Sequence, residues 1–296
     1  FSRTFNENHS LTVMAGHSYN WDTGRGLYTT ARGFVNDVLK NENMNAGNPN
    51  LRQIYNDGYY LSKLLSFYGR INYSLKDKYL LTATMRADGS TKFGKNNKWG
   101  YFPSGAVSWK MHNEPWLKQS RWLSELKLRL SYGASGNQGI SSYQTLDRYG
   151  MEKFWHNGEW ATVIGPGYEV GRTGANDRYM VWGGIANPDL KWEKTNQFDI
   201  GFNLNLFRNR LNFDISYYYK LTTDLLLERP VPHTTGFTSV MDNIGKVANQ
   251  GLDFMVNTVN IDTKDFGWSS TLNFNYNKNE IKKLGENDED ILTGPW

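Results

Sequence analysis

The sequence predicts an all-β protein whose strands form an antiparallel up-and-down sheet, part of a transmembrane β-barrel. Two patterns predict this fold. Apolar and polar residues alternate over repeated runs of about ten residues, the length of a tilted strand that crosses a bilayer. The connections between these runs are alternately short and long. No run approaches the roughly 18 consecutive apolar residues of a membrane-spanning helix, which excludes a helical membrane protein.

The first half of the chain shows the alternation most clearly within residues 64–110. Phe67 and Ile71 fall on one side of a strand whose other side carries Ser, Arg and Asn. After the polar turn 76–78 the pattern restarts, with Leu81 again on the apolar side. A restart after a short polar turn is the signal of a β-hairpin. The strands predicted in this half are 1–5, 10–19, 66–75, 79–88 and 99–110.

The second half repeats the plan. Phe198, Ile200 and Phe202 alternate with Gln, Asp and Asn, and a turn at 208–209 leads into a return strand of the same kind. The last predicted pair likewise opposes aromatic residues to a series of asparagines. The strands predicted here are 126–133, 197–206, 211–220, 245–259 and 266–278, which brings the total to roughly ten.

The connections differ in length in a regular way. The short ones are 6–9, 76–78, 207–210 and 260–265, and the long ones are 20–61, 89–98, 134–195 and 222–243. The connection 111–125 is intermediate, and a short helix is expected in it. In an up-and-down sheet alternate connections lie on the same edge, so one edge is tight and the other is bulky. This asymmetry is typical of outer-membrane barrels, with short periplasmic turns and long extracellular loops, and unusual for a soluble domain.

The composition narrows the function classes. Of the 296 residues 15% are aromatic, which suits aromatic girdles at membrane interfaces or a carbohydrate-binding surface. The net charge of +4 comes without a dense Lys/Arg cluster, so no nucleic-acid partner is expected. No cysteine is present, which excludes disulfides and thiolate metal sites. Since no signal-peptide pattern precedes the first strand, we expect an internal fragment of a larger protein.

The polar side of the predicted sheet carries many charged residues. Charged groups are rarely buried without partners, so we expect this side to line a wide lumen and the apolar side to face lipid. Aromatic residues near the strand ends fit interfacial belts. The alternative is a β-sandwich whose core holds the apolar side. The predicted lumen-facing residues are Arg70, Arg86, Asp88, Lys127, Arg129, Asp199 and Asp214.

Aromatic residues in the long connections are the candidate ligand contacts. Exposed aromatic rings stack on sugars, and long loops on a rigid scaffold concentrate binding residues. The alternative is that these rings pack the loops against each other or against a partner. The candidates are Trp21, Trp155, Trp160, Tyr179 and Trp182.

Motifs for catalysis or metal binding are missing. The five histidines are not at zinc-ligand spacing, and no H-E-x-x-H occurs. The acidic run 286–290 lacks the spacing and glycine of a calcium loop. Ser135 has no partner that would indicate a nucleophile, and G-x-S-x-G is absent. We therefore expect neither an enzyme nor a cofactor.

Several stretches resemble, in the same order, the SusC/RagA-type TonB-linked outer-membrane transporters, the nutrient-uptake barrels of Bacteroidetes. The matching stretches are FYGRINYSLKDKYLLTATMRADGSTKFG (67–94), WGYFPSGAVSWKMHNEPWL (99–117), LKLRLSYGASGNQGI (126–140), NPDLKWEKTNQFDIGF (187–202), DLLLERPVPHTTGFTSVMDNIGKVANQGLDF (224–254) and WSSTLNFNYNKNEI (268–281). The least similar parts, 21–60 and 151–182, lie on the long-loop edge, where substrate specificity would vary.

The resemblance implies a 22-stranded barrel around an N-terminal plug. It also implies a TonB box that couples to TonB, a SusD-like surface lipoprotein, and energised import of oligosaccharides or peptides across the bacterial outer membrane. Residues 1–296 would then be a partial barrel domain, without the plug, the TonB box, the signal peptide and the remaining strands. Because the segment would expose two unpaired sheet edges, we expect it to be insoluble without detergent.

Two other function classes remain open at this point. An outer-membrane barrel enzyme would need a catalytic constellation at the long-loop edge. A soluble carbohydrate-binding β-sandwich would explain the aromatic content but not the alternation of short and long connections.

Overall fold

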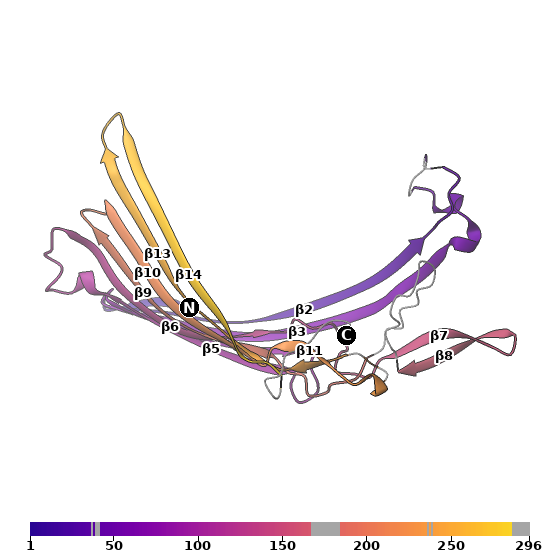
Figure 1. Cartoon of the computed structure of the whole chain (residues 1–296). Coiled ribbons are helices and arrows are strands. Elements are labelled where there is room, and N and C mark those ends of the chain that lie inside the picture. The colour runs from indigo at the N-terminus through magenta and orange to yellow at the C-terminus, as the bar shows by residue number, and fades with distance from the viewer. Residues whose placement is uncertain (37, 39–41, 167–183, 236, 238, 286–296) are drawn as a thin grey trace.

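The computed structural model describes the whole chain except residues 37, 39–41, 167–183, 236, 238 and 286–296. Ten strands form one curved antiparallel sheet in the order β1-β2-β3-β4-β5-β6-β9-β10-β13-β14 (Figure 1). Their bounds are β1 Ser2–Phe5, β2 His9–Thr30, β3 Gln53–Leu75, β4 Tyr79–Ser90, β5 Trp99–Lys110, β6 Leu123–Asn137, β9 Glu193–Leu206, β10 Leu211–Thr223, β13 Lys246–Asp262 and β14 Gly267–Lys283.

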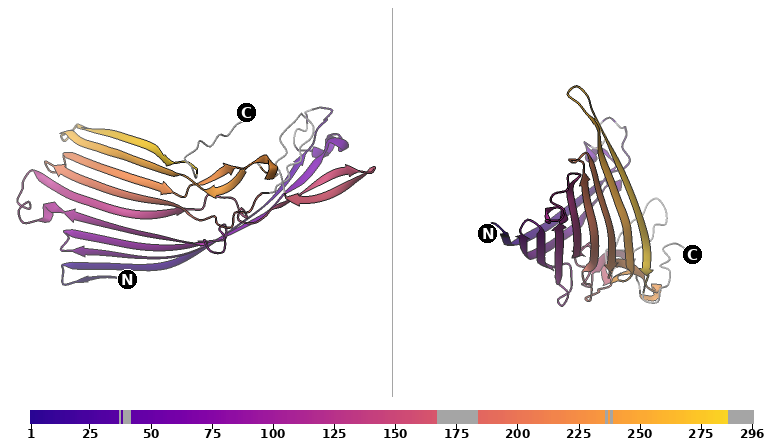
Figure 2. Two further views of the ribbon diagram at one scale, coloured as in Figure 1. Left: turned by 60° about the horizontal axis from the view of Figure 1, so that its bottom comes forward. Right: turned by 90° about the vertical axis from the view of Figure 1, so that its left-hand side faces the viewer.

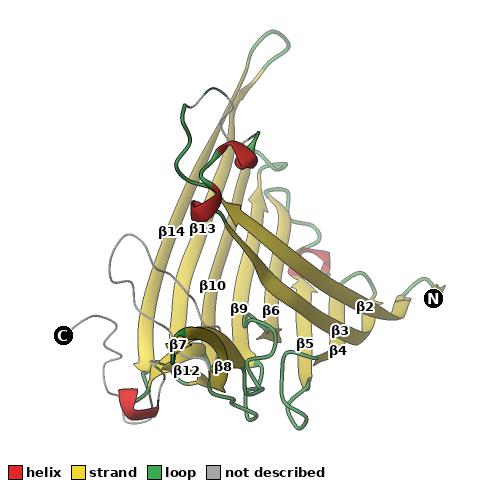
Figure 3. Cartoon of the chain, turned by 90° about the vertical axis from the view of Figure 1, so that its right-hand side faces the viewer, coloured by secondary structure: helices red, strands yellow, loops and turns green. Residues whose placement is uncertain are grey.

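Two separate hairpins accompany the sheet, β7 (Tyr149–His156) with β8 (Glu159–Pro166) and β11 (Leu226–Pro230) with β12 (Ser239–Asn243). Helical structure in the described residues is confined to 3₁₀ turns, drawn red in Figure 3. None of these turns is long or apolar enough to span a membrane. The 3₁₀ turns are η1 Met44–Ala46, η2 Pro49–Leu51, η3 Met111–Asn113 and η4 His233–Thr235.

The predicted up-and-down order is confirmed. Sequential sheet strands are neighbours throughout, and the pairing skips only the two hairpins. The short turns gather at one edge of the sheet, while both hairpins and the long connections lie toward the other (Figure 2). We call these the turn edge and the loop edge. The apolar side chains stay exposed, as Phe67 (50%) and Leu81 (49%) illustrate. The β-sandwich alternative is therefore wrong, because a sandwich would cover them.

Three predicted irregular connections contain strand. β2 and β3 continue past the predicted limits, Tyr19 and Leu61, and pair as far as Thr30 with Gln53. They form a two-stranded ribbon that extends past the other strands (Figure 1). The alternation disappears there because the described residues of β2 beyond Tyr19 are mostly exposed on both sides, so no buried side imposes a period of two.

The β7–β8 hairpin is the second difference from the prediction, since it lies inside the connection expected over 134–195. Its turn is Asn157–Gly158, and both residues have positive φ (50° and 85°). Asn-Gly is the preferred pair for a two-residue hairpin turn, because both positions require left-handed backbone. This sequence signal was available and was overlooked. The β11–β12 hairpin similarly occupies part of the connection expected over 222–243.

The tight turns use consecutive left-handed residues, as at Lys76 and Asp77 (φ 52° and 50°). This geometry matches the twist of the strands that it joins. The intermediate connection after β5 contains only the 3₁₀ turn Met111–Asn113 in place of the expected short helix.

A charged network closes the turn edge. The Glu114 carboxylate accepts hydrogen bonds from Lys78 Nζ at 2.8 Å, Tyr79 Oη at 2.7 Å and Trp109 Nε1 at 3.1 Å. These donors stabilise the ionised carboxylate, so they lower the pKa of Glu114 from 4.5 to about 2. The network ties the connection after β5 back to β4 and β5.

Rings on the polar side lie over glycines of the neighbouring strand. A Cβ on Gly16 would be 2.7 Å from Cζ of Tyr68, its cross-strand partner. A Cβ on Gly251 would be 2.6 Å from Cζ of Tyr218, also its partner. Each ring occupies the space that a side chain would take, a pairing that fixes strand register.

Candidate functional site

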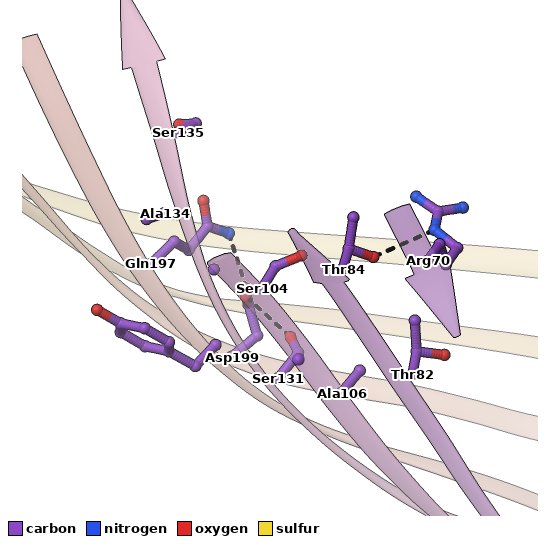
Figure 4. A pocket seen from close by; sticks show the side chains of 13 residues that line it. Arg70, Thr82, Thr84, Ser104, Ala106, Ser131, Ala134, Ser135, Gln197 and Asp199 are labelled. Atoms are coloured by element: carbon purple, nitrogen blue, oxygen red, sulfur yellow. Dashed lines mark hydrogen bonds between the residues drawn. The ribbon is translucent and has the colours of Figure 1, made fainter. Parts of the chain in front are cut away.

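The polar side of the sheet contains a hollow of about 340 Å³ that spans β3 to β9. Serine and threonine hydroxyls from three strands line it, with Arg70 and Asp199 on opposite sides (Figure 4). An adjoining hollow of about 420 Å³ shares Thr84, Ser104 and Ser135 with the first. We call the continuous feature the polar trough. Its hydroxyl, guanidinium and carboxylate groups suit hydrogen bonding to a polar solute.

All seven predicted lumen-facing residues lie on one side of the sheet. The register decides this, because residues paired across strands share a side. Arg70 pairs with Thr84, Thr84 with Ser104, and the same side continues into β6 and β9 through the pair Ser131 and Asp199. That these residues line a lumen stays a prediction.

The first charged group in the trough is the ion pair of Arg86 and Asp88. Arg86 Nε donates to both carboxylate oxygens of Asp88 at 2.9 and 2.7 Å, and Arg86 Nη2 donates to Ser66 Oγ at 3.0 Å. Asp88 is only 6% exposed. The guanidinium also lies 5.9 Å from the ring centroid of Tyr68. With its charge matched by the nearly buried Asp88 carboxylate, this group stabilises the wall of the trough.

A second charged group spans three strands. Arg129 Nη2 on β6 and Asn203 Nδ2 on β9 each donate to the Asp214 carboxylate on β10, both at 2.7 Å. The guanidinium reaches β10 by crossing over Gly201, where a Cβ would lie 2.8 Å from Nη2. A side chain at that position would therefore displace the guanidinium.

The remaining predicted charged residues form no ion pair with any residue that the structure describes. Arg70 Nε donates to Thr84 Oγ1 at 3.2 Å. Asp199 accepts from Gln197 Nε2 at 2.9 Å and from Ser131 Oγ at 3.3 Å. Lys127 makes no ion pair or side-chain hydrogen bond within the described part of the chain. These groups keep hydrogen-bonding capacity for a solute.

An amide ladder continues the polar side beyond the residues that were predicted. Asn279 Nδ2 donates to Asn249 Oδ1 and Thr271 Oγ1 donates to Asn257 Oδ1, both at 2.7 Å. The alternating asparagines of β14 were the available signal, and they were noticed only as strand pattern. The ladder joins β13 to β14 at the edge of the sheet.

The described candidate aromatics lie on two different elements, β2 and the β7–β8 hairpin. Trp21 lies in β2, not in a loop, and is 66% exposed. Trp155 and Trp160 are cross-strand partners in the β7–β8 hairpin. Tyr179 and Trp182 lie outside the described residues. Ligand contact by these five residues stays a prediction.

The long connections are tied together over the end of the trough. Trp192 Nε1 donates to the carbonyl of Lys98 at 3.0 Å, and Asn97 Nδ2 donates to the carbonyl of Asp189 at 2.9 Å. Asn243 Nδ2 donates to the carbonyl of Lys191, also at 2.9 Å. We call segments 91–98, 187–192 and 241–243 the connection clasp.

The clasp has its own apolar core. Phe102 of β5 is 5% exposed, and its ring meets Trp192 edge-on with centroids 5.5 Å apart. The ring of Phe93 packs on the same indole, with the two ring centroids 5.0 Å apart. The core thus attaches the connections to the sheet at the loop edge. Its buried members are Phe93, Phe102, Ile140, Leu190 and Trp192.

Metal chemistry has no candidate here. Among the described residues, no group of three or more His, Cys, Asp and Glu side chains could hold a metal ion.

Comparison with known proteins places the chain in a family. Residues 1–295 match the family described as TonB dependent receptor-like, beta-barrel. The chain therefore belongs to the TonB-dependent receptors of the bacterial outer membrane, and it forms part of their β-barrel. The predicted family and fold class are confirmed.

Particular relatives refine this assignment. TonB-dependent receptor P3 of Formosa agariphila is 38% identical over 95% of this chain and 26% of its own length. TonB-dependent receptor SusC of Bacteroides thetaiotaomicron is 40% identical over 76% of this chain and 21% of its own. A solved structure of the RagAB peptide transporter matches with a TM-score of 0.81 and 29% identity, covering 96% of this chain and 29% of that one.

The chain thus spans about a quarter of the length of the curated relatives that it matches. These relatives are receptors and transporters, in agreement with the expectation that the chain is not an enzyme.

Proposed function

We propose that this chain forms part of the barrel of a SusC-type importer that carries a bulky polar nutrient, an oligosaccharide or a peptide, across the outer membrane. The observation that carries the proposal is the polar trough, a hydrogen-bonding wall on the side of the sheet opposite to the exposed apolar side. In a closed barrel this wall lines the lumen. Similarity to SusC and to the RagAB peptide transporter supports the same function.

The apolar side fits a bilayer. On β5, Trp99 and Trp109 lie ten residues apart on that side, which is about 33 Å along a strand. At a tilt of about 40° this becomes roughly 25 Å, the height of the apolar band of an outer-membrane barrel. The two tryptophans then mark the interfaces, with the loop edge outside the cell.

The proposed partners follow from the family. A SusD-like surface lipoprotein would capture the solute at the loop edge, and TonB would supply energy through parts of the receptor outside this chain. Two solute classes are retained because the trough offers hydroxyl, amide and charged groups, which serve oligosaccharides and peptides alike.

Uptake by the full-length receptor tests the proposal. Arg70→Gln and Asp199→Asn remove the charges that face each other across the trough while keeping most of the side-chain volume. Since a hydrogen bond to a charged group contributes about 1.5–3 kcal/mol, we expect uptake to fall about ten- to 100-fold at limiting solute. Lys118→Gln at the turn edge is the control.

The solute mixture whose uptake falls in the two variants identifies the substrate class. The assay uses a labelled oligosaccharide mixture and a labelled peptide mixture with cells carrying equal amounts of receptor. If both variants import both mixtures at the control rate, the trough does not contact the transported solute and the proposal fails.

A further inference from the structure

A basic and aromatic patch lies on the ribbon formed by the ends of β2 and β3. It comprises Trp21, Arg25, Tyr59 and Lys63, and we call it the basic strip. Lys63 Nζ lies 6.0 Å from the ring centroid of Trp21, and the Arg25 guanidinium carbon lies 5.2 Å from that of Tyr59. Cross-strand pairing explains both contacts, since Trp21 pairs with Lys63 and Arg25 with Tyr59.

The strip is on the apolar side of the sheet. Lys63 precedes Leu65 and Phe67 at a spacing of two, so its side chain shares their side. From Tyr73 to Leu65 this side of β3 carries no charge, and Lys63 is the first cation on it. The polar trough lies on the opposite side. The strip therefore continues the proposed lipid-facing surface.

The position along the strand places the strip at the outer membrane surface. Lys63 lies ten residues from Tyr73, the same spacing as that between the two tryptophans of β5. This again corresponds to roughly 25 Å of height at a tilt of about 40°. Arg25 and Tyr59 lie four residues further, which adds about 10 Å. The strip thus covers the layer where headgroups begin.

The cations of the strip have no acidic partner among the described side chains. Neither Lys63 nor Arg25 forms an ion pair with a described side chain. Their aromatic neighbours hold them by cation–π contact and remain exposed, Trp21 at 66% and Tyr59 at 49%. The strip therefore presents two oriented positive charges beside two apolar rings.

We propose that the basic strip binds the phosphorylated headgroup of a lipid in the outer leaflet. A guanidinium donates in bidentate fashion to a phosphate, an ammonium adds a second charge, and the rings lie at the apolar–polar boundary, where tryptophan and tyrosine are favoured. A protein partner over the lumen mouth would meet the loops and the polar side. The strip faces outward, where lipid is the neighbour.

The proposal is tested with the full-length receptor in mild detergent, by native mass spectrometry. The probes are monophosphorylated lipid A and the same lipid A without phosphate. Lys63→Gln with Arg25→Gln removes both cations. Lys118→Gln with Lys264→Gln at the turn edge causes the same change in net charge and is the matched control.

Wild-type receptor and control should retain the phosphorylated lipid in preference to the other, and inorganic phosphate should not displace it. At about fivefold per cation near a charged surface, the strip variant should bind roughly 30-fold more weakly. If the strip variant does not assemble, Arg25→Gln alone, on the exposed ribbon, should weaken binding about fivefold.

Three results would overturn the proposal. Equal retention of both forms of lipid A would show that phosphate is not recognised, and displacement by inorganic phosphate would indicate a site for free anions. Loss of a co-purifying lipoprotein with unchanged lipid binding would make the strip a protein contact. Solute uptake is not part of this readout, so failure here leaves the proposed import function untouched.

Discussion

Replacing Phe102 by alanine should open the connection clasp without unfolding the sheet. The ring is 5% exposed and contacts Trp192, so the substitution removes the side chain of β5 against which the connections pack. A buried Phe→Ala change costs about 3–5 kcal/mol. The clasp lies at one end of the trough, so the lost stability affects the clasp and not the whole sheet. The equilibrium constant for local opening of the clasp should therefore rise by about 100-fold or more.

Hydrogen exchange on the full-length receptor measures this opening. The reporter amides are those of Ser90, which donates to the carbonyl of Lys98, and Leu190, which donates to that of Asn187. Both should exchange about 100-fold faster in Phe102→Ala, whereas the amides of the strands near the turn edge should keep their rates.

Tyr101→Ala provides the matched control, since Tyr101 is the adjacent aromatic residue on the apolar side and is 57% exposed. It should leave the reporter amides unchanged. If exchange in Phe102→Ala rises by less than about threefold, or rises equally in both variants, the apolar core does not hold the clasp and the reasoning is refuted.

Three further predictions follow from close contacts. Gly94→Ala should raise protease cleavage within the clasp, since its Cβ would overlap the backbone carbonyl oxygen of Pro188; Gly139→Ala, whose Cβ would meet only the movable side-chain amide of Asn137, is the comparison. Glu114→Gln should lower the melting temperature near pH 6, and the gap to wild type should close as the pH falls from 4.5 toward about 2, because a lowered carboxyl pKa stabilises the fold only while the group is ionised; a gap independent of pH would contradict this. Gly201→Val should destabilise the barrel by about 1–3 kcal/mol in urea unfolding by displacing the guanidinium above it, and an unchanged midpoint would argue against that contact.

The central sheet could be predicted from the sequence because each of its strands separates two environments. Phe198, Ile200 and Phe202 are apolar on one side for the same reason that Asp199 is polar on the other, so alternation reports the strand directly. The ribbon beyond Tyr19 could not be found in this way, since its described residues on β2 are mostly exposed on both sides.

The partners within the polar side depend on register, which the sequence determines only through the whole sheet. Arg129 and Asp214 were both predicted to share a side, and they do. Their contact across β9 requires a glycine at 201, and no local pattern indicates which of many charges meets which. The charged groups could therefore be predicted as a set, and their pairing only from the structure.

The rings that cover glycines bear on the width of the passage. Tyr68 and Tyr218 are long side chains, yet each fills the volume that Gly16 or Gly251 leaves free instead of projecting from the wall. Each glycine and its cross-strand tyrosine together thus cover the backbone with the thickness of a single side chain. If the polar side lines the lumen as proposed, these two rings add little to the thickness of the barrel wall. An alanine in place of Gly16 would then displace the Tyr68 ring toward the bore, so a single methyl group would narrow the passage at that position.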